Sequence, residues 1–269
     1  MSIATPGSRL AEAFARRPAD GLPGLIPYFT AGFPERHDTP RLLAAAERAG
    51  CLAVEVGIPF SDPLADGPTI QRSSQQALAS GMTAAGALAA VAEARDGGLT
   101  IPVVLMTYVN PVLAFGLERF CAQAAAAGAE AVIVPDLPDD EAAQLRDAAD
   151  AAGLALILLV APTTTAARLE AACRRATGFV YCVSVTGTTG ARARISQEAM
   201  DLLVRVRAVT TLPRALGFGL SRHEHIRALR GRAEAAVVGA ALLDRIAAGQ
   251  GGPVDAAERF LAELLGAEA

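Results

Sequence analysis

Short hydrophobic runs alternate along the whole chain with longer segments in which hydrophobic and polar residues recur at helical spacing. A run that is apolar at successive positions predicts a strand buried on both faces, whereas the longer segments predict amphipathic helices. The predicted strands cover residues 24–30, 52–56, 102–107, 131–135, 155–160, 179–183, 214–218 and 235–238. Because each strand leads into a helix, the pattern indicates a parallel sheet covered by helices.

Several predicted helices carry recognisable start signals. Thr39 before Pro40 predicts an N-cap followed by proline at the first helical position, and Thr83 predicts a second cap. Ser221 and Glu224 have the spacing of a capping box. The predicted helices cover residues 8–17, 41–49, 72–79, 84–95, 117–127, 141–152, 166–176, 197–209, 221–229, 240–248 and 253–265.

Eight strand–helix units in 269 residues predict a (β/α)8 TIM barrel with an extra N-terminal helix and an additional C-terminal helix. No linker or shift in composition interrupts the chain, so we expect residues 1–269 to form a single domain. The alternative is an open doubly wound sheet. That fold normally shows a GxGxxG turn after its first strand, and the sequence has none there.

Composition narrows the possible environments and partners. The chain is 52% hydrophobic and 19% charged with a net charge of −4, so nucleic acid and acidic membrane surfaces are poor partners. Its four cysteines form no CxxC pair, which favours buried free thiols in a reducing compartment. No signal peptide or membrane-spanning run is recognisable, and we expect a cytoplasmic protein.

The segment 52–71 carries the strongest chemical signal. Glu55 interrupts a buried strand, and burial should favour its neutral form, so that it can exchange protons near neutral pH. The following loop is stiffened by prolines and contains Asp62 and Asp66. We expect Asp66 to stay ionised and to accept a hydrogen bond from a substrate, although an ordinary surface turn whose aspartates cap the next helix remains the alternative.

Glycines gather after the late strands. Gly190, Gly217 and Gly219 follow or end the sixth and seventh strands, and Gly239 and Ala240 begin a helix after the eighth. Backbone N–H groups at such loops and at a helix N-terminus can bind phosphate without a basic side chain. The alternative is that these glycines only permit turns with positive φ.

Other polar residues near strand ends give weaker signals. Asp136 precedes a helix and is better explained by helix capping or loop bracing than as a catalytic acid. His37, His223 and His225 lack the spacing of a metal site, and we expect His223 and His225 to be solvated.

Six motifs in order, VEVGIPFSDPLADGPTIQ, VVLMTYVNP, VIVPDLP, FVYCVSVTGTTGAR, GFGLS and VVGAAL, resemble the tryptophan synthase alpha chain family across nearly the whole predicted barrel. The resemblance implies a lyase of L-tryptophan biosynthesis that cleaves indole-3-glycerol phosphate to indole and D-glyceraldehyde 3-phosphate by a retro-aldol reaction. It further implies the following site residues: catalytic Glu55, Asp66 and Tyr181; substrate-binding Tyr28, Thr30, Ile70, Met106, Tyr108, Ile133, Thr189 and Phe218; phosphate-binding Gly190, Gly217, Gly219, Gly239 and Ala240; and partner-contacting Pro59, Asp62 and Asn110.

The resemblance also implies a partner. We expect an α2β2 tetramer with a beta chain that carries pyridoxal phosphate, no metal or cofactor in this chain, and mobile lids at residues 59–66 and 184–195. The alternatives are a stand-alone lyase that releases indole, a catalytically weak barrel that only activates a beta chain, and a barrel isomerase or synthase that acts on a related precursor.

Two positions depart from the family pattern. Ala240 stands where many members have serine, so we expect one fewer side-chain hydrogen bond to the phosphate. Tyr28 stands where phenylalanine is also common, and its hydroxyl needs a polar partner.

Overall fold

The computed structural model describes residues 8–17, 20–184, 195–217, 219–249 and 251–266. Eight parallel strands pair in chain order, and the eighth pairs with the first to close a barrel. The strands are β1 (Gly24–Thr30), β2 (Val54–Gly57), β3 (Val103–Met106), β4 (Ala131–Ile133), β5 (Ala155–Val160), β6 (Val180–Val183), β7 (Arg214–Gly217) and β8 (Ala235–Val238). The predicted TIM barrel is therefore confirmed, and each strand lies within two residues of its predicted bounds.

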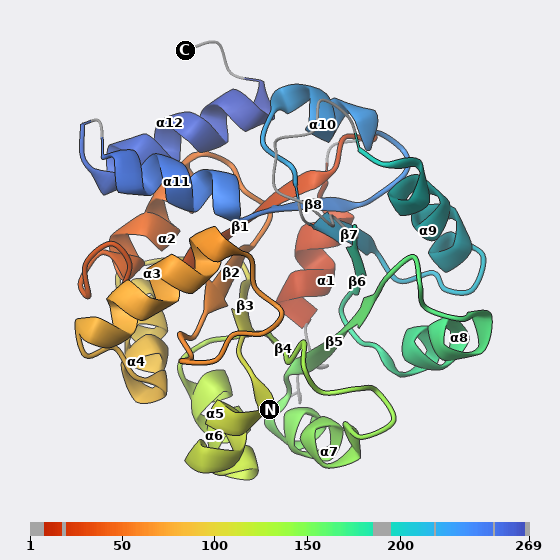
Figure 1. Ribbon diagram of the computed structural model, residues 1–269, viewed down its shortest axis with the longest axis horizontal. Coiled ribbons are helices and arrows are strands. Elements are labelled where there is room, and N and C mark those ends of the chain that lie inside the picture. Colours follow the sequence, from red (N-terminus) through yellow and green to blue (C-terminus); the bar gives the residue numbers. More distant parts are fainter. Residues whose placement is uncertain (1–7, 18–19, 185–194, 218, 250, 267–269) are drawn as a thin grey trace.

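Helices ring the barrel (Figure 1). They are α1 (Ser8–Ala15), α2 (Thr39–Arg48), α3 (Pro68–Ala79), α4 (Ala84–Asp96), α5 (Val109–Phe115), α6 (Leu117–Ala126), α7 (Ala143–Ala152), α8 (Ala166–Arg175), α9 (Gln197–Arg207), α10 (His223–Ala228), α11 (Ala240–Ala248) and α12 (Pro253–Leu265). The sequence did not predict α5, and it placed the start of α3 four residues too late. Both differences lie in loops rich in proline and glycine, where helical periodicity is short.

The extra N-terminal helix covers the end of the barrel at which the strands begin. The ring of Phe14 lies 5.8 Å from that of Phe179, which directly precedes β6. The guanidinium of Arg9 lies 2.6 Å from the carboxylate of Glu130, which precedes β4. The opposite end, where the strands finish, is left to the loops.

Two buried ion pairs hold the entrances of the strands. Arg95 contacts Glu130 at 2.9 Å, and Glu130 also accepts a hydrogen bond from the N–H of Val103. Arg214 contacts Glu234 at 2.7 Å. Because each buried charge lies beside an opposite charge, the burial of these residues has a structural explanation and does not indicate a functional site.

The predicted helix caps are only partly correct. Thr83 accepts a hydrogen bond from the N–H of Gly86, as expected of an N-cap. Thr39 is instead the first residue of α2, because its hydroxyl accepts from the N–H of Gly32 and Asp38 takes the cap position. The capping box at Ser221 is also wrong, since Arg222 is the N-cap of α10 and no side chain caps that helix.

No single helix among the described residues has the length and apolar character needed to cross a membrane. The bent pair of α3 and α4, which meet at 95°, passes that test only when the two helices are taken together.

Candidate active site

The centre of the candidate site is Glu55, in the middle of β2. Its neighbours in register are Tyr28 on β1 and Val104 on β3, and its side chain is 1% exposed. The atom Oε2 is buried and has no hydrogen-bond partner among the described residues, nor does a basic group there lie within ion-pair distance. Since Glu130 and Arg214 are buried with opposite charges beside them, Glu55 is the exception that calls for a functional explanation.

The loop that follows β2 brings a second carboxyl group to this end of the barrel. The N–H of Asp66 donates to the carbonyl of Pro63 at 3.0 Å, and Gln71 donates to the carbonyl of Asp66 at 2.9 Å. The hydroxyl of Tyr108 accepts from the N–H of Ala65 at 3.1 Å and also interacts with the Asp66 carboxylate. The loop is therefore fixed both along the chain and across to β3.

Burial gives the two carboxyl groups separate ionisation ranges. Desolvation, followed by the charge of Asp66, raises the pKa of Glu55 to about 8. Desolvation raises the pKa of Asp66 to about 6, although its hydrogen bond to Tyr108 opposes the rise. Asp66 is thus more desolvated than expected of a residue on a polar loop. Near neutral pH, Glu55 is nevertheless mostly protonated and Asp66 mostly ionised. This contrast suits one proton-transferring group beside one group that stabilises positive charge.

All three tyrosines of the chain lie at this site, and two of them need a neighbouring glycine. A methyl group at Gly57 would lie 1.9 Å from the hydroxyl of Tyr28, and one at Gly217 would lie 2.4 Å from that of Tyr181. Both phenols are buried, and desolvation raises the pKa of each well above its usual range, so both stay neutral. Gly217 is buried, and its lack of a side chain makes room for Tyr181. The prediction of Gly217 as a phosphate-binding residue did not include this contact.

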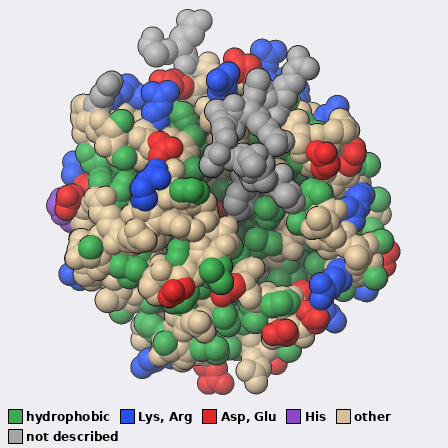
Figure 2. All heavy atoms as spheres, in the orientation of Figure 1, with side chains coloured by type: hydrophobic (Ala, Val, Ile, Leu, Met, Phe, Trp, Pro, Cys, Tyr) green, Lys and Arg blue, Asp and Glu red, His purple; other side chains and the backbone are tan. Residues whose placement is uncertain are grey.

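Apolar side chains complete the described part of the site. Met106 at the end of β3 lies beside Ile133 of β4 in register, and both are buried. The hydroxyl of Thr30 is 2.7 Å from that of Ser73, which ties β1 to α3. The structure therefore gives Thr30 a bracing contact, and its contact with substrate stays a prediction. In the space-filling view, hydrophobic side chains surround a hollow at the centre of the barrel face (Figure 2).

The predicted phosphate side lies next to the apolar side. A methyl group at Gly239 would be 3.4 Å from Cβ of Tyr28 and 3.7 Å from Cδ1 of Ile70. Gly239 is the N-cap of α11 and Ala240 is its first residue, so first-turn N–H groups begin beside these two side chains. Gly219 has φ +80° and is exposed.

His225 braces the loop that carries Gly219. Its Nδ1 accepts a hydrogen bond from the N–H of Ser221 at 3.2 Å, and the side chain is 3% exposed. The expectation that His225 is solvated is wrong, because this contact and the packing of α10 bury it. His223 is half-buried, with Nδ1 2.9 Å from the carbonyl of Leu264. The spacing of Ser221 and Glu224 predicts a capping box, whereas the contact that forms joins Ser221 to His225, four residues further along.

The predicted partner surface is only partly at the surface. Asp62 and Asn110 are exposed, whereas Pro59 is buried in the chain alone and offers little area for contact. Two nearby exposed hydrophobic side chains were missed: Leu64, on the same loop as Asp62, is 91% exposed, and Leu113, on the same helix as Asn110, is 56% exposed. An isolated leucine in a loop gives no sequence signal of exposure.

Several predicted residues lie outside the described part of the chain: Thr189, Gly190, Phe218 and most of the second lid, 185–194. Asp136 accepts from the N–H of Val109, so its prediction as a loop brace is confirmed. Within the described ranges, no three His, Cys, Asp or Glu side chains gather as a metal site would require.

Comparisons with known proteins agree with this geometry. A family model described as Tryptophan synthase alpha chain matches residues 14–266. The tryptophan synthase alpha chain of Chloroflexus aurantiacus is 51% identical over 239 residues, which are 89% of this chain and 90% of that protein. That of Gluconacetobacter diazotrophicus is 46% identical over 96% of this chain and 95% of its own length. A chain in the structure of the tryptophan synthase α2β2 complex from Pyrococcus furiosus superposes with a TM-score of 0.86 at 41% identity, covering 92% of this chain and 98% of that one.

Proposed function

Because the chain belongs to the tryptophan synthase alpha chain family, we propose that the end of its barrel at which the strands finish cleaves indole-3-glycerol phosphate to indole and D-glyceraldehyde 3-phosphate. One observation carries the assignment of roles. Glu55 is fully buried with an unpartnered oxygen, next to a second carboxyl group that ionises in a lower pH range.

The proton movements follow from these two ionisation states. Neutral Glu55 donates a proton to carbon 3 of the indole ring, and the resulting cation is stabilised by ionised Asp66, which accepts a hydrogen bond from the ring N–H. The Glu55 carboxylate then takes the proton of the glycerol hydroxyl next to the ring. The bond between that carbon and the ring breaks, its electrons restore the indole, and an aldehyde forms. Glu55 finishes protonated, as it began.

The buried tyrosines and apolar residues would orient the ring. Tyr28 and Met106 lie on the two strands that flank β2, and Tyr108 lies two residues beyond the end of β3, so they can contact a flat substrate beside Glu55. The α11 N-terminus beside Gly239 would hold the phosphate. Aldol cleavage through a lysine Schiff base is not open to this chain, because its sequence contains no lysine.

Assembly with a beta chain follows from the family. Solved relatives include the α2β2 complex of Pyrococcus furiosus, and we propose the same partnership here, with pyridoxal phosphate held by the beta chain. Four exposed side chains would supply contacts: Asp62 and Leu64 on the loop after β2, and Asn110 and Leu113 on α5.

The test is indole release from indole-3-glycerol phosphate by the purified chain, with and without a tryptophan synthase beta chain. Released indole is separated from the remaining substrate by chromatography before it is measured, because both molecules contain an indole ring. We expect slow release alone and faster release with the partner. Absence of indole under both conditions would contradict the proposed function.

The pH dependence of kcat/KM follows from the two raised pKa values. Activity should rise as pH increases through about 6, where Asp66 loses its proton, and fall above about 8, where Glu55 loses its own. Because the two groups interact, the two limbs report apparent values for the pair. An Asp66→Asn variant should lose the acidic limb together with much of the activity. A profile that is flat from pH 5 to pH 9 would contradict these assignments.

Ala240→Ser tests the proposed phosphate site. The added hydroxyl can donate one hydrogen bond to the phosphate, so we expect tighter binding of inorganic phosphate by about 1 kcal/mol. Isothermal titration calorimetry measures the effect directly, and Ala241→Ser, one residue further along α11, serves as the control. Unchanged phosphate affinity in Ala240→Ser would show that the phosphate binds elsewhere.

A further inference from the structure

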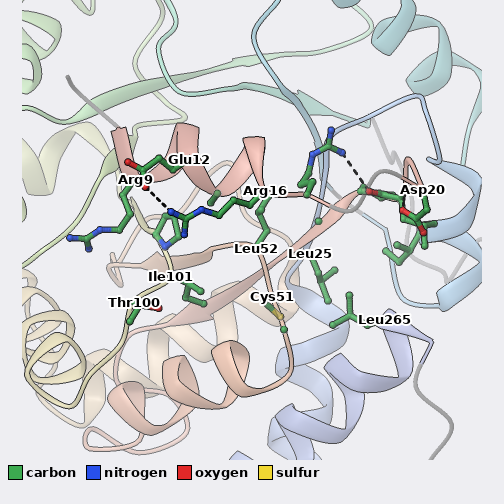
Figure 3. Close-up of a pocket in the computed structure, with 18 of the residues that line it drawn as sticks. Arg9, Glu12, Arg16, Asp20, Leu25, Cys51, Leu52, Thr100, Ile101 and Leu265 are labelled. Carbon is green, nitrogen blue, oxygen red and sulfur yellow. Dashed lines mark hydrogen bonds and ion pairs between the residues drawn. The ribbon is translucent and has the colours of Figure 1, made fainter. Parts of the chain in front are cut away.

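A cavity lies at the opposite end of the barrel from Glu55 (Figure 3). Its volume is about 430 Å³, within the range of small-molecule sites. It lies under α1, between the segments that lead into the first three strands, and α10 and α12 complete its wall. No residue of the proposed active site lines it.

The walls of this cavity are fixed by polar contacts. The carboxylate of Glu47 accepts hydrogen bonds from the N–H groups of Thr100 and Ile101, at 2.9 and 3.2 Å. Arg95 donates to the carbonyls of Leu99 and Ile101, at 2.7 and 2.8 Å. The segment that enters β3 is thus held from two helices, so this wall is already formed without a ligand.

The other walls are tied in the same way. Asp20 accepts from the N–H of Leu22 at 3.0 Å and lies 3.8 Å from Arg230. His223 contacts the carbonyl of Leu264, next to Leu265 in the lining. Between these fixed segments the floor is apolar, because the half-buried side chains of Leu52 and Ile101 line the space, with fully buried Leu25 behind the accessible surface (Figure 3).

Among the described arginines that line the cavity, one has no carboxylate within ion-pair distance. Arg9 is paired with Glu130 at 2.6 Å, and Arg16 with Glu12 at 3.3 Å. Arg17 also lines the cavity, and no carboxylate among the described residues lies within 4.0 Å of it; its charge helps to lower the pKa of Glu234, but that carboxylate is already paired with Arg214 at 2.7 Å. Nη1 of Arg17 reaches only the carbonyl of Leu22, at 3.5 Å, and its Nε is buried without a partner in that part of the chain. A guanidinium with spare donors beside an apolar floor suits an anion on a flat hydrophobic body.

We propose that this cavity binds a small aromatic carboxylate, with the ring on the floor of Leu52 and Ile101 and the carboxylate on Arg17. The site is separate from the one that holds Glu55, so ligand binding here and cleavage of indole-3-glycerol phosphate are measured independently. Its occupant would dock α1 more firmly against the barrel entrance.

The probe is 2-naphthoate, compared with its neutral isostere 2-naphthamide, by isothermal titration calorimetry on the full chain. We expect one equivalent of 2-naphthoate to bind about tenfold or more tightly than the amide, because only the carboxylate accepts charged hydrogen bonds. Arg17→Gln should remove that difference, whereas Arg207→Gln, an exposed arginine on α9, should leave it unchanged. Ala13→Phe, which fills the cavity from α1, should abolish binding and leave lyase activity intact.

Three results would overturn the proposal. They are no saturable binding of 2-naphthoate at millimolar concentrations, equal affinities for acid and amide in the unsubstituted chain, and displacement of 2-naphthoate by glycerol 3-phosphate. The last would place the probe at the proposed phosphate site. Lyase activity of Ala13→Phe shows whether this variant folds. If Ala13→Phe neither binds 2-naphthoate nor cleaves substrate, it has misfolded, and Arg17→Gln alone tests the proposal.

Discussion

Glu55→Gln should lower kcat for indole release by about 100-fold to 10,000-fold, the range expected when a general acid–base group is removed. The amide keeps the shape of the side chain but can neither give a proton to the indole ring nor take one from the glycerol hydroxyl. Because the substitution leaves the apolar walls and the α11 N-terminus in place, KM should change far less than kcat. The measurement is a steady-state assay of indole release with the beta chain present.

A matched control separates chemistry from folding. Glu130→Gln changes another buried glutamate, but one that is paired with Arg95 at the entrances of the strands, so it should lower stability and leave kcat nearly unchanged. Activation of the beta chain by Glu55→Gln provides a second check, because it needs only an intact surface. If Glu55→Gln retains more than about a tenth of the wild-type kcat, the role of Glu55 as the proton-transferring group is wrong.

The barrel could be predicted from the sequence because its strands are apolar on both faces and its helices are periodic. Those two signals are local, so the bounds of β1, β5 and β8 match to the residue. Glu55 could be singled out for the same reason, since a carboxyl group in a buried run is costly without a partner. The motifs then added the family, which the comparisons confirm.

The remaining features depend on contacts between residues far apart in the chain. The interaction of Tyr108 with Asp66 joins two loops, and only the closed barrel brings those loops together. The contact of His225 with Ser221, four residues apart, forms in place of the capping box predicted from the three-residue spacing of Ser221 and Glu224. Burial of Pro59 and the cavity under α1 likewise depend on tertiary packing, which no local pattern encodes.

The same Glu55→Gln substitution should also make the stability of the barrel less sensitive to pH. The pKa of Glu55 is about 8 in the folded chain against an ordinary value of 4.5, so the folded state holds this proton more tightly than the unfolded state. Its contribution to stability is therefore complete below about pH 4.5 and is lost as pH rises through about 8. Between pH 5 and pH 8 the loss amounts to about 3 kcal/mol.

Glutamine does not ionise, so the variant should gain about 3 kcal/mol of unfolding free energy relative to wild type as pH rises from 5 to 8. The cost of burying the amide is the same at both pH values and cancels in this difference. Urea unfolding followed by near-UV circular dichroism suits the test, because the chain has no tryptophan and its three tyrosines lie at the site. Should the gap between the two proteins stay constant with pH, Glu55 would have its ordinary pKa in the folded chain and would be ionised throughout the range from pH 5 to pH 8. Indole-ring protonation would then need another donor, so this stability experiment also tests the proposed mechanism without substrate.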